Sequence, residues 1–168
     1  MVVPNSVRIV RNRVLPSAYN DSPVRHLFLL ALAIPVSAQL RDVKINFAGI
    51  GCAPCIESLP SRLQRIRGVE SATVDAQAGT VILHLAIQNR VRIEQLRDAI
   101  EQDGTKTTTA TITAHGTLIQ EEGKWRLSPL TIPLESTPEL KPGPARLDAV
   151  ISNLHQPVLH ATRIILEE

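Results

Sequence analysis

The sequence predicts an α+β fold, in which a ferredoxin-like βαββαβ domain at residues 39–114 is followed by a small β-rich domain at residues 115–168. Between residues 42 and 114, the spacing of apolar residues changes from two to about 3.6 and back, in the order strand, helix, strand, strand, helix, strand. Gly68 and Gly104 stand directly after the two helical stretches, where glycine commonly ends a helix. From residue 115 onward, short β-prone runs alternate with turn residues.

The first half of the βαββαβ domain holds one strand, one helix and a pair of strands. Residues 43–47 alternate between apolar and polar side chains, which is typical of a half-buried strand. From Ile56 to Arg67, apolar residues recur at helical spacing, and we expect Gly68 to end this helix. Residues 69–74 and 80–86 then read as two strands joined by a short turn.

The second half adds a helix and a fourth strand. Asn89 is a candidate N-cap for a helix in which Ile93, Leu96 and Ile100 line up, and residues 106–113 are threonine-rich and β-prone. Both helices would cover one face of a four-stranded antiparallel sheet, and their apolar stripes would form the core.

The C-terminal part, residues 115–168, is predicted to be a separate small all-β domain. Its size and strand spacing suggest a meander or a partly closed, OB-like barrel, an analogy that implies no ligand. Trp125 is expected to pack into its core. The predicted strands are residues 116–120, 125–134, 145–151 and 158–166.

Residues 1–38 are expected to be a cleaved signal peptide. Leu27–Val36 is an unbroken apolar run preceded by Arg25, and Val36-Ser37-Ala38 offers small residues where a signal peptidase cuts. A run of about ten residues is too short to span a bilayer as a helix, so a buried core helix is the other interpretation. We expect a periplasmic or secreted protein whose only membrane contact is the cleaved segment. Translation could also start downstream of Met1, at Val14 or Val24.

The charge distribution argues against a nucleic-acid partner. The formal net charge is +2, but four of the 18 Lys and Arg residues precede residue 27, against one acidic residue. The remaining chain carries 14 basic and 15 acidic residues, without a basic patch interleaved with aromatic side chains.

Both cysteines of the chain, Cys52 and Cys55, lie in one loop just ahead of the first predicted helix. Three positions apart, their sulfurs can converge on one point. A helix start supplies free N–H groups and a positive dipole end, which favour thiolate over thiol. Thiolate is the form that binds soft metal ions, so this pair is the candidate metal site.

The residues around this pair resemble the heavy-metal-associated domain family over about residues 42–114. The resemblance rests on three sequence motifs: Gly49-Ile50-Gly51-Cys52-Ala53-Pro54-Cys55, Gly68-Val69 after the first helix and Asp103-Gly104 after the second. It implies that Cys52 and Cys55 are the ligands of one metal ion, most often Cu(I) and otherwise Hg(II), Zn(II) or Cd(II). It also implies a metal carrier or scavenger rather than an enzyme, with a metal-transporting membrane ATPase or another metal carrier as partner.

The sequence departs from the family pattern around the site. Ile50 stands where Met is usual, Gly51 replaces Thr or His, and Pro60 falls inside the predicted helix, where proline removes a hydrogen bond. Thr105 follows the glycine after which the family often has Lys or an aromatic residue, and Lys106 comes one position later. The sequence therefore identifies no charge partner for the thiolates.

Two other functions remain open from the sequence. Cys-Ala-Pro-Cys also resembles thioredoxin-type motifs, so an exported protein could use the pair as a thiol-disulfide oxidoreductase, or keep it as an inert structural disulfide. The domain could also be a non-enzymatic interaction module that retains only the shape of a metal-binding fold. No G-x-S-x-G motif occurs, and the histidines have no helical i,i+4 pair that would suggest a second metal site.

Overall fold

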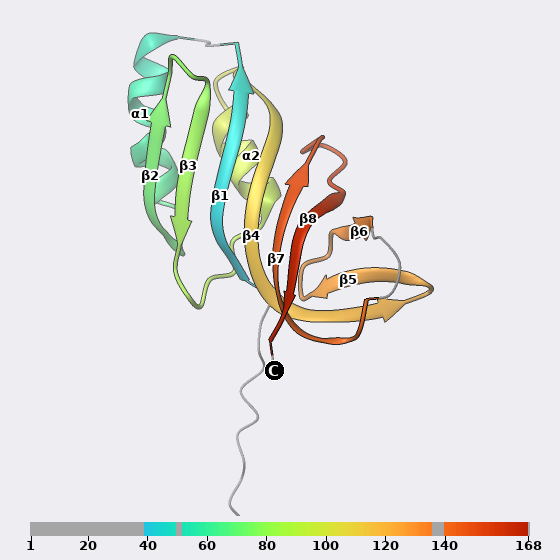
Figure 1. The fold of residues 1–168 in the computed structure, drawn as a ribbon. Helices are drawn as coiled ribbons and strands as arrows, with labels where there is room; N and C mark the ends of the chain where they lie inside the picture. Colours follow the sequence, from blue (N-terminus) through green and yellow to red (C-terminus); the bar gives the residue numbers. More distant parts are fainter. Residues whose placement is uncertain (1–38, 50–51, 136–139, 168) are drawn as a thin grey trace, which may run out of the picture. The chain divides into compact units, whose positions relative to one another are not determined.

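A computed structural model describes residues 39–49, 52–135 and 140–167 (Figure 1). The expected signal peptide, residues 1–38, lies outside the described residues, as do Ile50 and Gly51 of the cysteine loop. In the part that is described, no helix is both long and apolar enough to cross a membrane.

The described chain contains two helices and eight strands. In order they are β1 (Gln39–Ala48), α1 (Ala53–Gln64), β2 (Val69–Asp75), β3 (Thr80–Leu85), α2 (Ile93–Glu101), β4 (Lys106–Glu121), β5 (Lys124–Ser128), β6 (Pro133–Glu135), β7 (Gly143–Ile151) and β8 (Leu159–Leu166).

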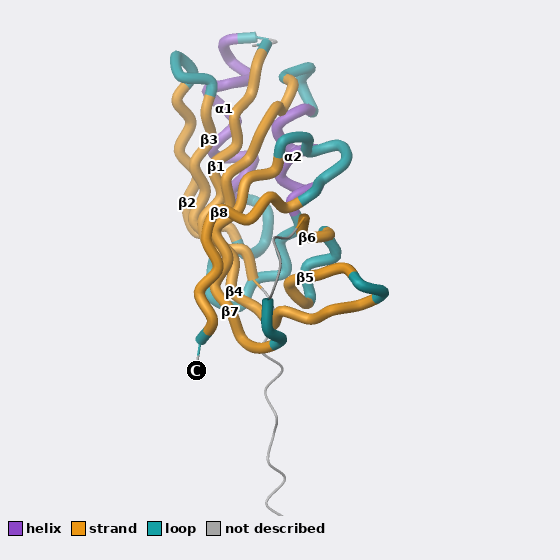
Figure 2. The backbone as a smooth tube through the Cα atoms, turned by 45° about the vertical axis from the view of Figure 1, so that its right-hand side comes forward, coloured by secondary structure: helices purple, strands orange, loops and turns teal. Residues whose placement is uncertain are grey.

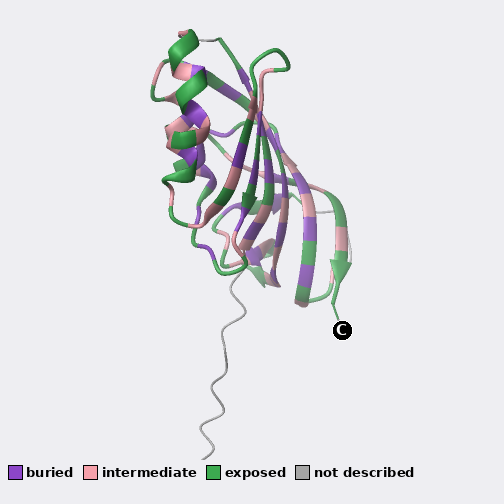
Figure 3. Ribbon diagram, turned by 90° about the vertical axis from the view of Figure 1, so that its left-hand side faces the viewer, coloured by how far each residue is buried: buried purple, intermediate pink, exposed green. Residues whose placement is uncertain are grey.

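The elements up to the first half of β4 form the predicted ferredoxin-like arrangement. The strand order is β2-β3-β1-β4, and the pairings β2–β3, β3–β1 and β1–β4 are antiparallel. Both helices lie on the same side of this sheet (Figure 1). Buried and exposed residues alternate along its strands (Figure 3), because successive side chains of a strand point to opposite faces. The inward residues of β1 and β3 pack with those of the two helices in one core.

Two local predictions in this half differ from the structure. Helix α1 begins at Ala53, three residues earlier than expected, so that it includes Cys55, and it ends at Gln64, three residues before the expected end at Arg67. Pro54 is compatible with this start because the first helical turn needs no N–H from it. The expected N-cap, Asn89, is not at the start of α2, where Arg92 stands instead. Asn89 is buried, and its amide nitrogen donates to the Leu40 and Ala86 carbonyl oxygens, 2.7 Å each.

Strand β4 is longer than predicted and belongs to two parts of the fold. One of its edges pairs with β1 through residues 106–115 and then with β5 through residues 117–121, while the other edge pairs with β7 through residues 110–118. The boundary expected between residues 114 and 115 therefore falls inside a continuous strand, and the described residues on its two sides form one compact unit. Figure 2 shows β4 running from beside α2 into the lower part of the molecule.

The C-terminal strands close a ring with β4. The pairings run from β4 to β5, β6, β8 and β7, and β7 returns to β4. The predicted strand 125–134 is divided into β5 and β6 around Pro129, which has no N–H to donate to a ladder. Trp125 is half-buried against the common core, as its size suggests.

Candidate metal-binding site

Both predicted site residues lie at the start of α1, just after the connection from β1. Cys52 is the N-cap residue of α1, and Cys55 lies in the first turn of that helix. The backbone N–H of Cys55 donates to the Cys52 carbonyl oxygen at 3.1 Å and to Cys52 Sγ at 3.2 Å. The sulfur thus occupies the position in which an N-cap side chain accepts from the free N–H groups of a helix start.

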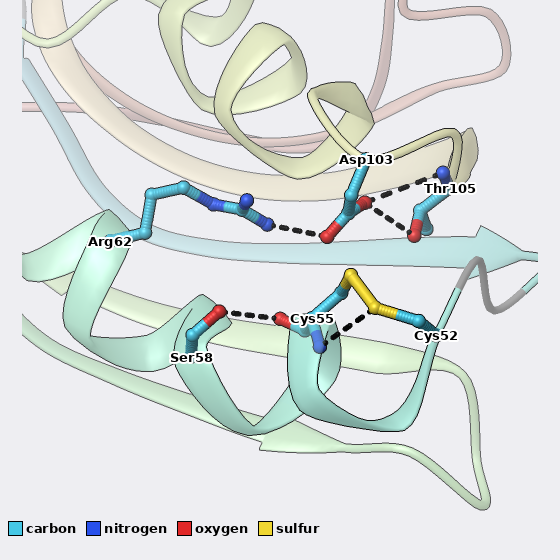
Figure 4. Close-up of a disulfide and its surroundings, with 6 residues drawn as sticks. All are labelled: Cys52, Cys55, Ser58, Arg62, Asp103 and Thr105. Carbon is cyan, nitrogen blue, oxygen red and sulfur yellow. Dashed lines mark hydrogen bonds and ion pairs between the residues drawn. A yellow bond between two sulfur atoms is a disulfide. The ribbon is translucent and has the colours of Figure 1, made fainter.

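The structure brings the two sulfurs together as a Cys52–Cys55 disulfide, with the Cα atoms 5.2 Å apart (Figure 4). Both cysteines are half-buried rather than enclosed by the core. The pair is therefore shown in its oxidised form, which carries no thiolate for a metal ion. Reduction would release two sulfurs that already face one another at the rim of the domain.

The chemistry of the reduced pair follows from its position. The positive end of the α1 dipole and the N–H of Cys55 stabilise negative charge on sulfur. In the described residues, no group of three or more His, Cys, Asp or Glu side chains could hold a metal ion. In this part of the chain the cysteine pair thus offers two soft ligands without a third such side chain placed to complete the site, which suits a soft cation better than a four-coordinate structural zinc ion.

The loop between α2 and β4 lies beside the cysteine loop. Lys106 at the start of β4 pairs with Ala48 at the end of β1, so that both loops leave the sheet at the same end. Arg62 on α1 reaches across with its Nη2 atom 2.9 Å from Oδ2 of Asp103, and Oδ1 of Asp103 accepts from the Thr105 hydroxyl at 3.0 Å (Figure 4).

The ion pair between Arg62 and Asp103 is largely shielded from water, with side chains 23% and 11% exposed. Burial alone would raise the pKa of Asp103, but hydrogen bonds from Arg62 and Thr105 and the charge of Arg62 outweigh it, so the pKa lies below its ordinary value. The pair fastens the α2–β4 loop to α1 beside the cysteines. Sequence reasoning missed Arg62, because its partner lies 41 positions further along the chain and no short-range pattern marks the contact.

The end of α2 is attached to β4 by a second carboxylate. Glu101 accepts from the backbone N–H of Thr107 at 2.9 Å and from the hydroxyl of the same residue. Burial would raise the pKa of Glu101, but these hydrogen bonds, with the charges of His155 and Arg97, hold it below the ordinary value. Both ends of the α2–β4 loop are therefore held by carboxylates.

The histidines do not form a further metal site in the described residues. Each of the four that are described lies within 3.3 Å of one carboxylate, and each side chain is at least 40% exposed. The pairs are His84 with Asp42, His115 with Glu167, His155 with Glu101 and His160 with Glu135.

Known proteins are similar to the part of the chain that contains both cysteines. Residues 44–106 match the family model described as the heavy-metal-associated domain. The copper chaperone CopZ of Staphylococcus haemolyticus (strain JCSC1435) is 38% identical over 60 residues, which are 87% of that protein and 36% of this chain. An uncharacterized protein of Haemophilus influenzae is 34% identical over 65 residues, which are 93% of that protein and 39% of this chain.

Solved structures resemble about two fifths of the chain. A CopZ metallochaperone is 31% identical, with coverage of 98% of that chain and 42% of this one and a TM-score of 0.34. The N-terminal domain of a potential copper-translocating P-type ATPase from Bacillus subtilis, solved in the Cu(I)-loaded state, is 25% identical, with coverage of 85% and 41% and a TM-score of 0.36.

Proposed function

The chain belongs to the heavy-metal-associated domain family, and from this premise we propose that it carries one soft metal ion, Cu(I) above all, between Cys52 and Cys55. The observation that carries the proposal is the meeting of two half-buried sulfurs at the start of α1. Two thiolates at a helix N-terminus suit a monovalent soft cation, and an open two-ligand site lets an incoming thiol attack the ion. The role is transfer or scavenging, without a chemical step catalysed by the protein.

The partner that supplies or receives the ion is proposed from the relatives. A copper chaperone is similar to this chain over 60 residues, so a metal-transporting membrane ATPase or another metal carrier is the proposed acceptor. We further propose that the protein works in the periplasm or is secreted, after removal of residues 1–38. The apolar run Leu27–Val36 supports this location.

An anaerobic titration with Cu(I) tests the proposal. Fully reduced protein should bind one equivalent, and Cys52→Ser should lose that binding, because a single thiolate cannot replace two. Ser58→Ala is a matched control: it removes a hydroxyl that donates to the Cys55 carbonyl oxygen at 3.0 Å but leaves both sulfurs in place. Retention of one tightly bound Cu(I) by the Cys52→Ser variant would contradict the proposed ligand pair.

Thiol-disulfide exchange is the second candidate function, and the Cys52–Cys55 disulfide is the observation that favours it. An oxidoreductase should catalyse reduction of a protein disulfide and have an oxidising potential, whereas a carrier needs neither. A non-enzymatic interaction module should show neither metal binding nor exchange. One set of assays on the reduced protein thus separates the three functions.

For the C-terminal part, we propose an OB-like barrel formed by β4, β5, β6, β8 and β7. The closed ring of pairings and the count of five strands support this assignment. Barrels of this kind serve many functions, so the assignment predicts no ligand.

A further inference from the structure

A polar cavity lies between the turn after α1 and the loop before α2. Its volume is about 350 Å³, and it is lined by Arg67, Gly68, Gln88, Asn89 and Arg90. In Figure 1 both of these connections lie at the end of the sheet opposite the cysteine loop. The cavity is thus separate from the proposed metal site.

The floor of this cavity is held in place by buried contacts. Gly68 has φ +105°, and a Cβ atom at this position would lie 2.8 Å from the Asn89 Cβ atom. The Gly68 carbonyl oxygen accepts from the Ala86 N–H at 2.9 Å, which joins the two connections. Asn89 is only 6% exposed and is bonded to the Leu40 and Ala86 carbonyl oxygens. These contacts fix the backbone at the base of the cavity, while the side chains of Arg67, Gln88 and Arg90 are exposed around it.

The cavity is positively charged. Arg67 and Arg90 are its ionisable lining residues, and in the described part of the chain neither guanidinium has an ion-pair partner within 4.0 Å. The Asn89 side chain is not free to bind a ligand. Its amide nitrogen donates to two backbone carbonyl oxygens, and its Oδ1 accepts from the Val91 N–H. The side chains left to meet a ligand are thus two arginines and the Gln88 amide.

The charged residues next to the cavity in the sequence include two further arginines. Arg65 and Arg92 are the cap residues of α1 and α2 at the two ends of these connections. The nearest carboxylates in the sequence are Glu70 on β2, which is exposed, and Glu94 in the first turn of α2, which is half-buried. Neither carboxylate lines the cavity.

We propose that this cavity binds the phosphate group of a phosphomonoester or phosphodiester through Arg67 and Arg90. Guanidinium groups match phosphate oxygens with paired hydrogen bonds, and two of them balance the dianion of a phosphomonoester and exceed the single charge of a phosphodiester. A volume of about 350 Å³ lies within the range of small-ligand pockets and exceeds the need of the phosphate alone, so part of the attached group also fits. The phosphate belongs either to a small soluble ester or to a phospholipid headgroup.

Two binding measurements on the full chain test the proposal and distinguish the sources. Glycerol 3-phosphate is titrated while the amide resonances of Gly68, Asn89 and Arg90 are followed by nuclear magnetic resonance. Cosedimentation is measured in parallel with vesicles of phosphatidylglycerol and of phosphatidylcholine. Saturable shifts confined to the cavity assign the site to soluble esters, and binding to phosphatidylglycerol vesicles alone assigns it to lipid.

Variants decide whether the cavity is responsible. Arg67→Gln combined with Arg90→Gln should weaken binding at least tenfold, whereas Lys44→Gln combined with Arg163→Gln removes the same charge from exposed positions and should change it less than twofold. Thermal unfolding of each variant shows whether it is folded, and its Cu(I) stoichiometry shows whether the metal site is intact. The proposal is overturned if wild type binds neither probe, or if both double variants lose binding equally.

Discussion

At the level of single residues, the rim of the cysteine site depends on Asp103. Its carboxylate joins the α2–β4 loop to α1 by accepting from Arg62, and it orders the loop itself by accepting from both the N–H and the hydroxyl of Thr105. Arg62 is mostly buried, and its Nε atom has no hydrogen-bond partner, so Asp103 is the group that compensates its charge. Loss of this carboxylate would leave a shielded guanidinium unpaired, which is costly.

We expect Asp103→Asn to destabilise the protein by roughly 1.5–3 kcal/mol at pH 7, the usual range for a hydrogen bond to a charged group. Because the folded-state pKa of Asp103 is depressed from 3.8, its contribution is complete above about pH 4 and is lost as the pH falls further. The difference from wild type should therefore shrink at pH 3. Urea unfolding at both pH values measures it.

An exposed carboxylate provides the control for this prediction. Glu70→Gln removes a charge from β2 that has no ion-pair partner in the described residues, so its effect should stay within about 0.5 kcal/mol at both pH values. A pH-independent effect of Asp103→Asn would show that the ion pair does not stabilise the loop.

At the level of elements, the sequence predicts the helices and strands that follow from the local spacing of apolar residues. It misses the contacts between residues that are far apart in the chain. The strands and helices up to residue 113 follow from apolar spacing and from Gly68 and Gly104, and the structure has them in the predicted order. Asn89 looked like a helix cap because it precedes α2, but the Leu40 carbonyl that it bonds is 49 residues away.

The cysteine pair shows the same division between local and distant information. Spacing was enough to predict that Cys52 and Cys55 converge, since both sit within one helical turn. The Arg62–Asp103 pair beside them was missed, because no short-range pattern marks it. Strand β4 is also longer than predicted: the predicted strands 106–113 and 116–120 are one continuous strand, and Gly116 is buried within it, opposite Ala145.

The connection between α1 and β2 allows a test of close packing between elements. Gly68→Ala should cost roughly 2–4 kcal/mol, since its positive φ strains an L residue and the new methyl group would meet Asn89. Gly104→Ala is the matched control, with φ +87° but no heavy atom within 4 Å of the new Cβ, and should cost only about 1–2 kcal/mol. Equal losses in chemical denaturation would mean that the contact with Asn89 contributes nothing.

At the level of the whole molecule, β4 decides whether the two halves can unfold separately. Its N-terminal part completes the sheet with β1, and its C-terminal part closes the ring with β5, while β7 pairs along both parts. Unfolding of either half alone would leave an edge of the other half without its hydrogen bonds. A division at residue 114 based on sequence predicts two transitions, whereas the shared strand predicts one.

Two probes that report on different halves distinguish these outcomes. Trp125 is the only tryptophan and lies in β5 of the ring, while both helices of the described chain lie on the sheet that ends with β4. Tryptophan fluorescence and helical circular dichroism should therefore give coincident urea transitions. Leu118, fully buried in the ring part of β4, sharpens the test: Leu118→Ala should cost about 2–5 kcal/mol and move both transitions together. A shift of the fluorescence transition alone would mean that the halves are independent folding units joined by a continuous strand.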